Sequence, residues 1–289
     1  MEKTVGIIGL GIMGGAIAAN LLERGWSVAG YDIVPERIEA LRAAGLKPTG
    51  GVAESVNAAP IILTSLPTPA AAHRVAAEMA AAGAPSRIIA ELSTFAISDK
   101  IAFKQPLEAA GHIPLDCPLS GTGAQAKMRD LIVYASGNSA AIARCQPLFA
   151  DFAKQSTDLG AYGNGSKMKF IANLLVAIHN VASAEAMALA ARAGLDLERV
   201  VEVIGPGAGG SRMFQMRAPM MASGVYEPPT MRVSMWQKDM DIIADFARGL
   251  GVATPLFDDT APIYAKALEM GLGDKDTAAV YEVMTRSEV

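Results

Sequence analysis

The stretch Val5-Gly-Ile-Ile-Gly-Leu-Gly-Ile-Met-Gly14 decides the fold. Its first half is an apolar run typical of a buried strand, and the segment Ile12 to Glu23 predicts a helix that ends at Gly25. Between them stands the pattern G-x-G-x-x-G, in the strand–turn–helix context that dinucleotide binding requires. The pattern predicts that a pyrophosphate binds over the helix N-terminus. The residues expected to hold the cofactor there are Gly9, Leu10, Gly11, Ile12, Met13 and Gly14.

An acidic residue stands where such a site needs one. Asp32 ends the next expected strand, Trp26 to Asp32. Its carboxylate can accept hydrogen bonds from ribose hydroxyls and would repel a 2′-phosphate, so the expected cofactor is NAD. Arg37 keeps NADP possible because a base just past the acid can accommodate a phosphate. An arginine at this place is nevertheless more typical of a solvated helix face.

Apolar runs alternate with helical stretches up to about residue 160. This alternation predicts an α/β, Rossmann-type, doubly wound parallel sheet in the N-terminal half. The further strands expected are Ile61 to Ser65, Arg87 to Leu92, Ile113 to Cys117 and Leu131 to Ser136.

The second half contains only helical signals. One long helix is expected from Asn164 to Ala193, and Gly194 ends it. The helices expected beyond it are Leu197 to Ile204, Val233 to Leu250, Pro255 to Met270 and Asp276 to Met284. We therefore predict a dinucleotide-binding domain at 1–162, a long interdomain helix at 163–194 and an all-α substrate and dimerisation domain at 195–289.

Composition excludes several classes of protein. The 289 residues carry 25 basic and 29 acidic side chains, a net charge of −4 that does not favour nucleic-acid binding. Two cysteines are too few for a disulfide framework, and three histidines away from them do not indicate a metal site. The apolar stretch Val5 to Ala19 is shorter than the roughly 20 residues of a membrane-spanning helix. We expect a cytoplasmic protein that binds no membrane.

An oxidation that gives a hydride to NAD must also remove a proton from the substrate. Two lysines near the start of the long helix are candidates to accept that proton. At about 100° per residue, Lys169 shares one helix face with Asn173, Val176 and Asn180, whereas Lys167 points nearly the opposite way. Burial lowers the pKa of a lysine towards the range that suits general acid–base catalysis. The helical pattern therefore favours Lys169.

Five separated segments resemble the β-hydroxyacid dehydrogenase family, which includes 3-hydroxyisobutyrate dehydrogenase, tartronate semialdehyde reductase and sugar-acid dehydrogenases. The segments are Gly9 to Gly14 with Asn20-Leu21, Leu66-Pro67, Ser93-Thr94, Asp116-Cys-Pro-Leu-Ser-Gly-Thr122, and Gly163-Asn-Gly-Ser-Lys-Met-Lys169 with Asn173. Lys238-Asp239 matches a further family pair beside the cofactor.

The resemblance implies hydride transfer between NAD(P) and a short 3-hydroxy acid. It implies Lys169 as general acid–base with Asn173 beside it. It places four more residues at the cofactor: Leu66, Pro67, Thr94 and Lys238. It places the substrate against Ser120, Gly121, Thr122 and, in a segment similar to the sugar-acid branch, Arg212. No metal is implied.

Some positions depart from the family pattern and leave the substrate open. Arg129 stands where glycine is usual, and Thr122 often has glycine. Ala71 and Ala172 replace asparagines, and Met231 stands where some relatives have an aromatic residue.

Three alternatives remain open: an enzyme similar to 6-phosphogluconate dehydrogenase, an imine reductase, and a non-catalytic NAD-binding module. Lys169 disfavours an imine reductase, and the short C-terminal part disfavours the first. Four methionines close together suggest a homodimer or homotetramer interface, although a core would look the same: Met213, Met216, Met220 and Met221.

Overall fold

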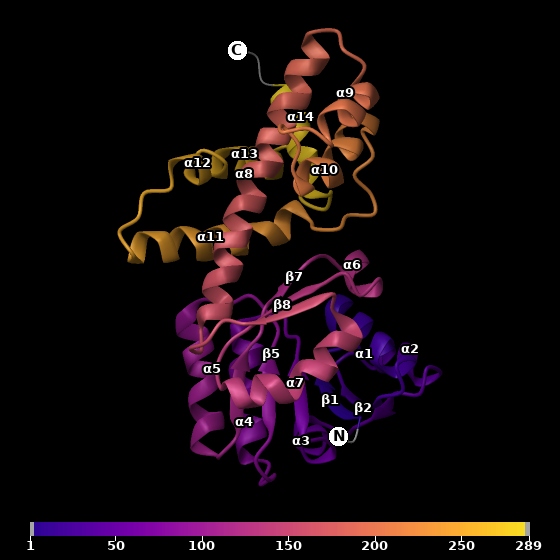
Figure 1. Cartoon of the computed structure of the whole chain (residues 1–289), viewed down its shortest axis with the longest axis vertical. Coiled ribbons are helices and arrows are strands. Elements are labelled where there is room, and N and C mark those ends of the chain that lie inside the picture. Colours follow the sequence, from indigo (N-terminus) through magenta and orange to yellow (C-terminus); the bar gives the residue numbers. More distant parts are fainter. Residues whose placement is uncertain (1–2, 287–289) are drawn as a thin grey trace. The chain divides into compact units, whose positions relative to one another are not determined.

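The computed structural model describes residues 3–286 and divides into two compact units, residues 1–169 and 170–289 (Figure 1). We call them unit 1 and unit 2. Unit 1 holds all the described strands, and unit 2 is built from helices.

The main sheet of unit 1 has six parallel strands in the order β3-β2-β1-β4-β5-β6. The strands are β1 (Thr4–Ile8), β2 (Ser27–Tyr31), β3 (Lys47–Pro48), β4 (Ile61–Thr64), β5 (Ile88–Glu91) and β6 (Ile113–Asp116). This order confirms the doubly wound fold, because a sheet that grows outward in both directions from its first strand has this sequence of strands.

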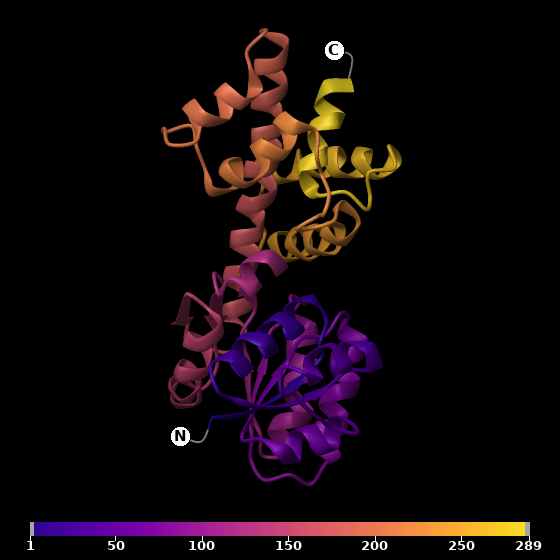
Figure 2. The same cartoon turned by 90° about the vertical axis from the view of Figure 1, so that its right-hand side faces the viewer.

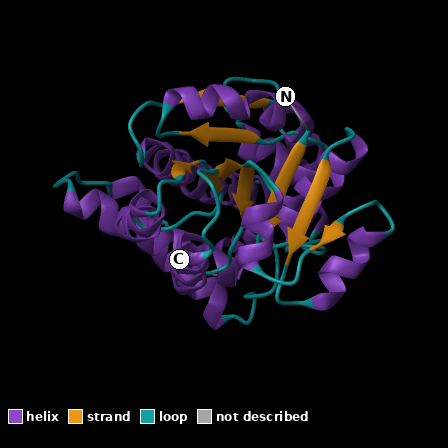
Figure 3. Cartoon of the chain, turned by 90° about the horizontal axis from the view of Figure 1, so that it is seen from below, coloured by secondary structure: helices purple, strands orange, loops and turns teal. Residues whose placement is uncertain are grey.

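Helices cover both faces of this sheet (Figure 3). They are α1 (Ile12–Glu23), α2 (Pro35–Arg42), α3 (Val52–Ala58), α4 (Pro69–Ala81), α5 (Ile97–Ala109) and α7 (Ser139–Phe152). Successive strand residues enter different hydrophobic clusters, as Ile7 and Ile8 do, because strand side chains alternate between faces.

One expectation for the sheet was wrong. The run around residues 131–136 does not join the parallel sheet but forms β8 (Ile132–Ala135) of a second sheet, between β7 (Leu119–Ser120) and β9 (Gln155–Asp158). Strand β7 is antiparallel to β8. The intervening helix α6 (Gly123–Lys127) has only five residues, too few for the crossover that a parallel neighbour needs.

Strand β9 lacks an apolar signal because its residues are Gln-Ser-Thr-Asp. No strand was expected over these residues, although they lie within the part of the chain where strands and helices were expected to alternate.

The long helix is α8 (Asn164–Arg192), close to the expected range. The shorter helices of unit 2 surround its C-terminal part (Figure 2). They are α9 (Leu197–Ile204), α10 (Arg212–Ser223), α11 (Val233–Gly249), α12 (Pro255–Asp258), α13 (Ala261–Glu269), η1 (Thr277–Ala279) and α14 (Val280–Arg286).

Two helical expectations in unit 2 need correction. The helix expected over 255–270 is interrupted at residues 259–260. Helix α10 was not expected, because it follows a glycine-rich run and contains Pro219. Its local signal is Ser211, whose Oγ accepts a hydrogen bond of 3.0 Å from the backbone N–H of Phe214.

Helix α8, and not the stretch near residue 5, is long and apolar enough to cross a membrane by length and composition, a test that core helices of soluble proteins also pass. Its part in unit 2 is packed into that unit's core. The rings of Phe170 and Phe246 lie 5.1 Å apart, and Asn180 Nδ2 donates to the hydroxyl of Tyr264 at 2.9 Å.

Candidate active site

The glycines of the first loop have different reasons to be there. A Cβ at Gly9, where φ is +92°, would lie 2.2 Å from the carbonyl oxygen of Ser65, and a Cβ at Gly14 would lie 1.9 Å from that of Gly9. Both are required by the protein's own packing. At Gly11 a Cβ would meet only an Arg37 nitrogen, at 3.9 Å. The open space at Gly11 fits the close approach of a group from outside the chain.

The N-terminus of α1 suits an anion. Its N-cap is Gly11, which supplies no side-chain oxygen to the first N–H groups, and the first turn of this helix holds no acidic residue. Unsatisfied N–H groups and the positive end of the helix dipole attract phosphate. Residues Gly9 to Gly14 therefore fit a dinucleotide.

Asp32 is buried and holds the loop together. Its Oδ2 accepts a hydrogen bond of 2.7 Å from the N–H of Leu10, and its Oδ1 accepts one of 2.8 Å from that of Val34. Arg37 Nη1 lies 3.3 Å from both oxygens. Arg37 is therefore paired with Asp32. The sequence had favoured an arginine on a solvated helix face.

Two further loops of unit 1 are tied to each other. The N–H of Leu66 donates to Ser93 Oγ at 2.9 Å, and Ser93 in turn donates its N–H to Glu91 Oε1 at 2.8 Å. Pro67 is exposed and Thr94 half-buried. The Leu66-Pro67 and Ser93-Thr94 segments, far apart in sequence, are therefore held side by side by a hydrogen bond.

The turn at residues 120–122 leads from β7 into α6. Ser120 is half-buried, Gly121 has φ of +132°, and Thr122 is the N-cap of α6. The N–H of Thr122 donates to Gln125 Oε1 at 3.0 Å. The segment can present a hydroxyl and backbone N–H groups to a carboxylate.

Arg129 has φ of +57°, and no other non-glycine residue among 3–286 has a positive φ. Glycine would adopt this conformation without strain, whereas an arginine does not.

The two candidate lysines differ in exposure. Lys169 is only 9% exposed, whereas Lys167 is exposed and its Nζ donates to Asn164 Oδ1 at 3.2 Å. Lys169 is the last residue of unit 1, which also contains the loops described above.

The remaining candidates lie in unit 2. Asn173 Nδ2 donates to Asp239 Oδ2 at 3.0 Å, and Lys238 Nζ lies 3.2 Å from Asp239 Oδ1. Arg212 is exposed in the first turn of α10. Arg217 of the same helix is buried against Asp276 at 2.7 Å, a structural pair.

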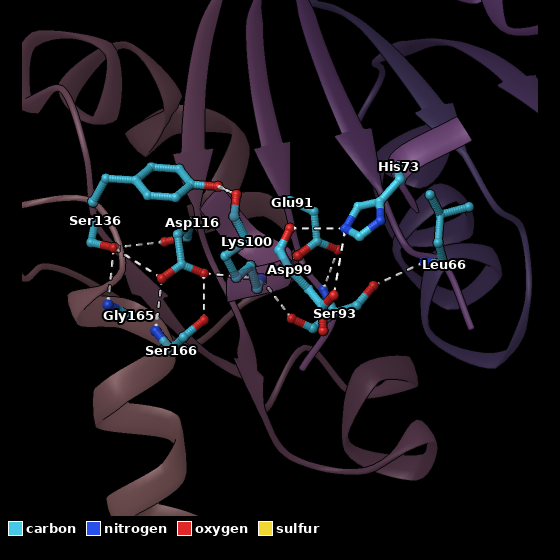
Figure 4. Close-up of polar contacts among 11 residues, drawn as sticks. Leu66, His73, Glu91, Ser93, Asp99, Lys100, Asp116, Ser136, Gly165 and Ser166 are labelled. Carbon is cyan, nitrogen blue, oxygen red and sulfur yellow. Dashed lines mark hydrogen bonds and ion pairs between the residues drawn. The ribbon is translucent and has the colours of Figure 1, made fainter. Parts of the chain in front are cut away.

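Sequence reasoning missed a buried charge cluster in unit 1. Glu91, Lys100 and Asp116 are fully buried, and the lysine pairs with both carboxylates (Figure 4). The available signal was two acidic residues at the ends of neighbouring expected strands. Among residues 3–286, no group of three or more His, Cys, Asp or Glu side chains could hold a metal ion.

Comparison with known families divides the chain in the same order. Residues 4–161 match a family described as the NAD binding domain of 6-phosphogluconate dehydrogenase. Residues 163–284 match one described as NAD-binding of NADP-dependent 3-hydroxyisobutyrate dehydrogenase.

Individual proteins match over nearly the full length. The chain is 32% identical to the L-threonate dehydrogenase of Cupriavidus necator, over 100% of this chain and 98% of that one. A Mycobacterium tuberculosis 3-hydroxyisobutyrate dehydrogenase structure with L-serine has a TM-score of 0.89 and 28% identity, covering 99% of this chain and 100% of the other. One from Salmonella typhimurium has a TM-score of 0.86 and 31% identity, covering 97% and 99%.

Proposed function

The chain belongs to the 3-hydroxyisobutyrate dehydrogenase family of NAD(P)-dependent hydroxyacid dehydrogenases, and we propose that it prefers NAD and oxidises a short, polar 3-hydroxy acid. The observation that carries the proposal is the pairing of an open glycine loop with a buried acid. Gly11 leaves room for a pyrophosphate, and Asp32 supplies a carboxylate for ribose. The match of residues 163–284 favours this family over 6-phosphogluconate dehydrogenase itself.

The substrate class rests on the relatives and on the turn at residues 120–122. The relatives are named for L-threonate and for 3-hydroxyisobutyrate, both small acids with a hydroxyl at carbon 3. We propose that Ser120, Gly121 and Thr122 bind the substrate carboxylate, and that Arg212 adds a contact to further hydroxyls or to a partner subunit. A turn with a hydroxyl and backbone N–H groups can hold a carboxylate without a full positive charge.

The reaction requires the loss of a hydride and a proton from the substrate alcohol. The nicotinamide of NAD, when bound, supplies the hydride acceptor. We propose that Lys169 takes the hydroxyl proton, since it is buried while Lys167 is exposed. Asn173, one helical turn on, would orient the lysine or the hydroxyl. Leu66, Pro67, Thr94 and Lys238 complete the proposed cofactor contacts.

The proposed function also assigns a role to each part of the chain. We propose a dinucleotide-binding domain at 1–162, an interdomain helix at 163–194 and a substrate and dimerisation domain at 195–289, in a cytoplasmic homodimer or homotetramer. Its partner is a small molecule rather than nucleic acid or membrane.

A turnover assay tests this function. Purified protein is mixed with NAD or NADP and a panel of acids, from three-carbon hydroxy acids through 3-hydroxyisobutyrate to four-carbon sugar acids, and reduced nicotinamide is followed by absorbance. We expect turnover of at least one 3-hydroxy acid and none of 6-phosphogluconate. Binding of NAD without turnover of any acid would support the non-catalytic module instead.

A further inference from the structure

Lys100 lies at the centre of the buried charge cluster. It stands in the first turn of α5, and its side chain is fully buried. Its Nζ pairs with Glu91, lies 2.9 Å from Asp116 Oδ1 and donates to the carbonyl oxygen of Ser93 at 2.7 Å. An ammonium group has three N–H donors, so these three acceptors use all of them.

Lys100 supplies the positive charge that pairs with both buried carboxylates. Glu91 and Asp116 are register partners at the ends of β5 and β6, so two like charges lie side by side. Burial lowers the pKa of Lys100, but the charges of Asp116 and Glu91 and their hydrogen bonds with the amine together raise it by more, so the group remains an ammonium ion. One cation between two anions leaves a single negative charge in the cluster.

The start of α8 accommodates the remaining charge. The N–H of Ser166 donates to Asp116 Oδ2 at 2.7 Å, and Ser166 Oγ donates to Asp116 Oδ1 at 2.8 Å. Ser136 joins the group, since its Oγ donates to Asp116 at 3.2 Å and accepts from the N–H of Gly165 at 2.9 Å. An anion at a helix N-terminus is favoured by the helix dipole.

The cluster therefore reaches two parts of the proposed site (Figure 4). On one side, Ser93 receives the Lys100 bond at its carbonyl, and its Oγ accepts from Leu66. On the other side, Asp116 accepts two hydrogen bonds from Ser166, which lies in the first turn of α8 and three residues before Lys169. Both arms lie within unit 1.

We propose that Lys100 is a positioning residue that fixes the Leu66 and Ser93 loops relative to the first turn of α8. The inference rests on the proposed function, in which these segments carry the nicotinamide contacts and the general acid–base. Lys100 touches neither substrate nor cofactor in this role. It sets the separation of the groups that do, and a misplacement of about 1 Å can cost roughly 100-fold in rate.

The test uses a charge-balanced pair of substitutions. Lys100→Met alone would leave two buried carboxylates facing each other and is expected to fold poorly. The double variant Lys100→Met/Glu91→Gln removes one charge of each sign and keeps an acceptor for the Ser93 N–H. The matched control is Lys104→Met, one turn along α5, whose Nζ lies 3.1 Å from Glu108 near the surface.

We expect the folded double variant to lose about 10- to 100-fold in kcat with an unchanged KM for NAD. The deuterium isotope effect on kcat, measured with substrate labelled at the carbinol carbon, should increase as hydride transfer becomes limiting. The control should match wild type in all three. A purely structural lysine would lower the melting temperature and move none of them.

Amide hydrogen exchange tests the same link without turnover. The amides of Leu66 and Ser166 should both lose protection from exchange in the double variant. Neither amide should lose protection in Lys104→Met. If wild type oxidises no hydroxy acid, the proposed function fails, while the exchange result still decides the link. Wild-type kcat in the folded double variant, or exchange that changes at only one of the two amides, would overturn the inference.

Discussion

Arg37 Nη1 lies 3.3 Å from each carboxylate oxygen of Asp32. Because Leu10 and Val34 already donate their N–H groups to the same carboxylate, Asp32 carries three donors. Of these, only the Arg37 side chain is about half exposed. A ribose hydroxyl that reaches Asp32 therefore competes with Arg37, and a 2′-phosphate would find Arg37 beside it.

The first prediction is that the cofactor preference follows this pair. Wild type should have the higher kcat/KM with NAD. Arg37→Ala should widen the preference for NAD, because it removes both the side chain that competes with ribose for Asp32 and a base that would lie beside a 2′-phosphate. Asp32→Ala should narrow it. A wild-type preference for NADP of tenfold, about 1.4 kcal/mol, would contradict the assignment of Asp32.

The second prediction concerns the hydroxyl of Ser120. If its hydroxyl binds the substrate carboxylate, Ser120→Ala should weaken binding by about 1.5–3 kcal/mol, the cost of a hydrogen bond to a charged group. The effect should appear as a raised KM for the hydroxy acid, with a smaller fall in kcat. Ser139→Ala, at an exposed serine that begins α7, is the control. An unchanged KM in folded Ser120→Ala would make Ser120 part of the turn only.

The third prediction concerns backbone strain. An L-residue in the left-handed region costs about 1–2 kcal/mol, and glycine gives back roughly half of that as chain entropy. Arg129→Gly should therefore raise the free energy of unfolding by about 0.5–1 kcal/mol, measured by urea denaturation. The exposed contact with Glu23, at 3.9 Å, contributes little. Arg129→Ala, which keeps the strain, should give no such gain.

The fourth prediction is that both thiols are inert in the folded protein. Burial raises the pKa of Cys117, and it raises that of Cys145 to about 12. Only the thiolate reacts with a disulfide reagent, and both thiols are buried, so at pH 8 the native protein should not react. Two thiols should appear after unfolding in guanidinium. Fast labelling of a native thiol would contradict the burial of that cysteine.

The parts of the molecule that depend on local pattern could be predicted from sequence. The glycine loop and α8 are marked by spacing and periodicity along a single segment. The cluster around Lys100 is not, since it depends on strand register and on which helix covers which strand ends. The Asp32–Arg37 contact spans only five residues and depends on the turn between β2 and α2. The second sheet was not predicted, because an apolar run does not show which sheet its strand joins. Helix α6 is too short for the crossover to a parallel neighbour.

The last prediction separates the two lysines of α8. If Lys169 is the general acid–base, Lys169→Ala should lower kcat by about 10²–10⁴-fold and leave NAD binding intact, because Gly11 and Asp32 are elsewhere. Lys169→Arg should be almost as damaging, since a guanidinium cannot give up its proton at neutral pH. Oxidation by wild type should speed up as pH rises, because only the neutral amine can accept the proton.

Lys167→Ala is the matched control, two residues away on the same helix. Its side chain is exposed and reaches only Asn164 among the contacts described above, so near-wild-type kcat is expected. The kcat of Asn173→Ala should fall between those of the two lysine variants, because in the proposed mechanism Asn173 would orient the reacting groups without exchanging a proton. The pair of lysine variants decides the assignment. An inactive Lys167→Ala beside a fully active Lys169→Ala would show that both the helical-face argument and the family motif point to the wrong lysine.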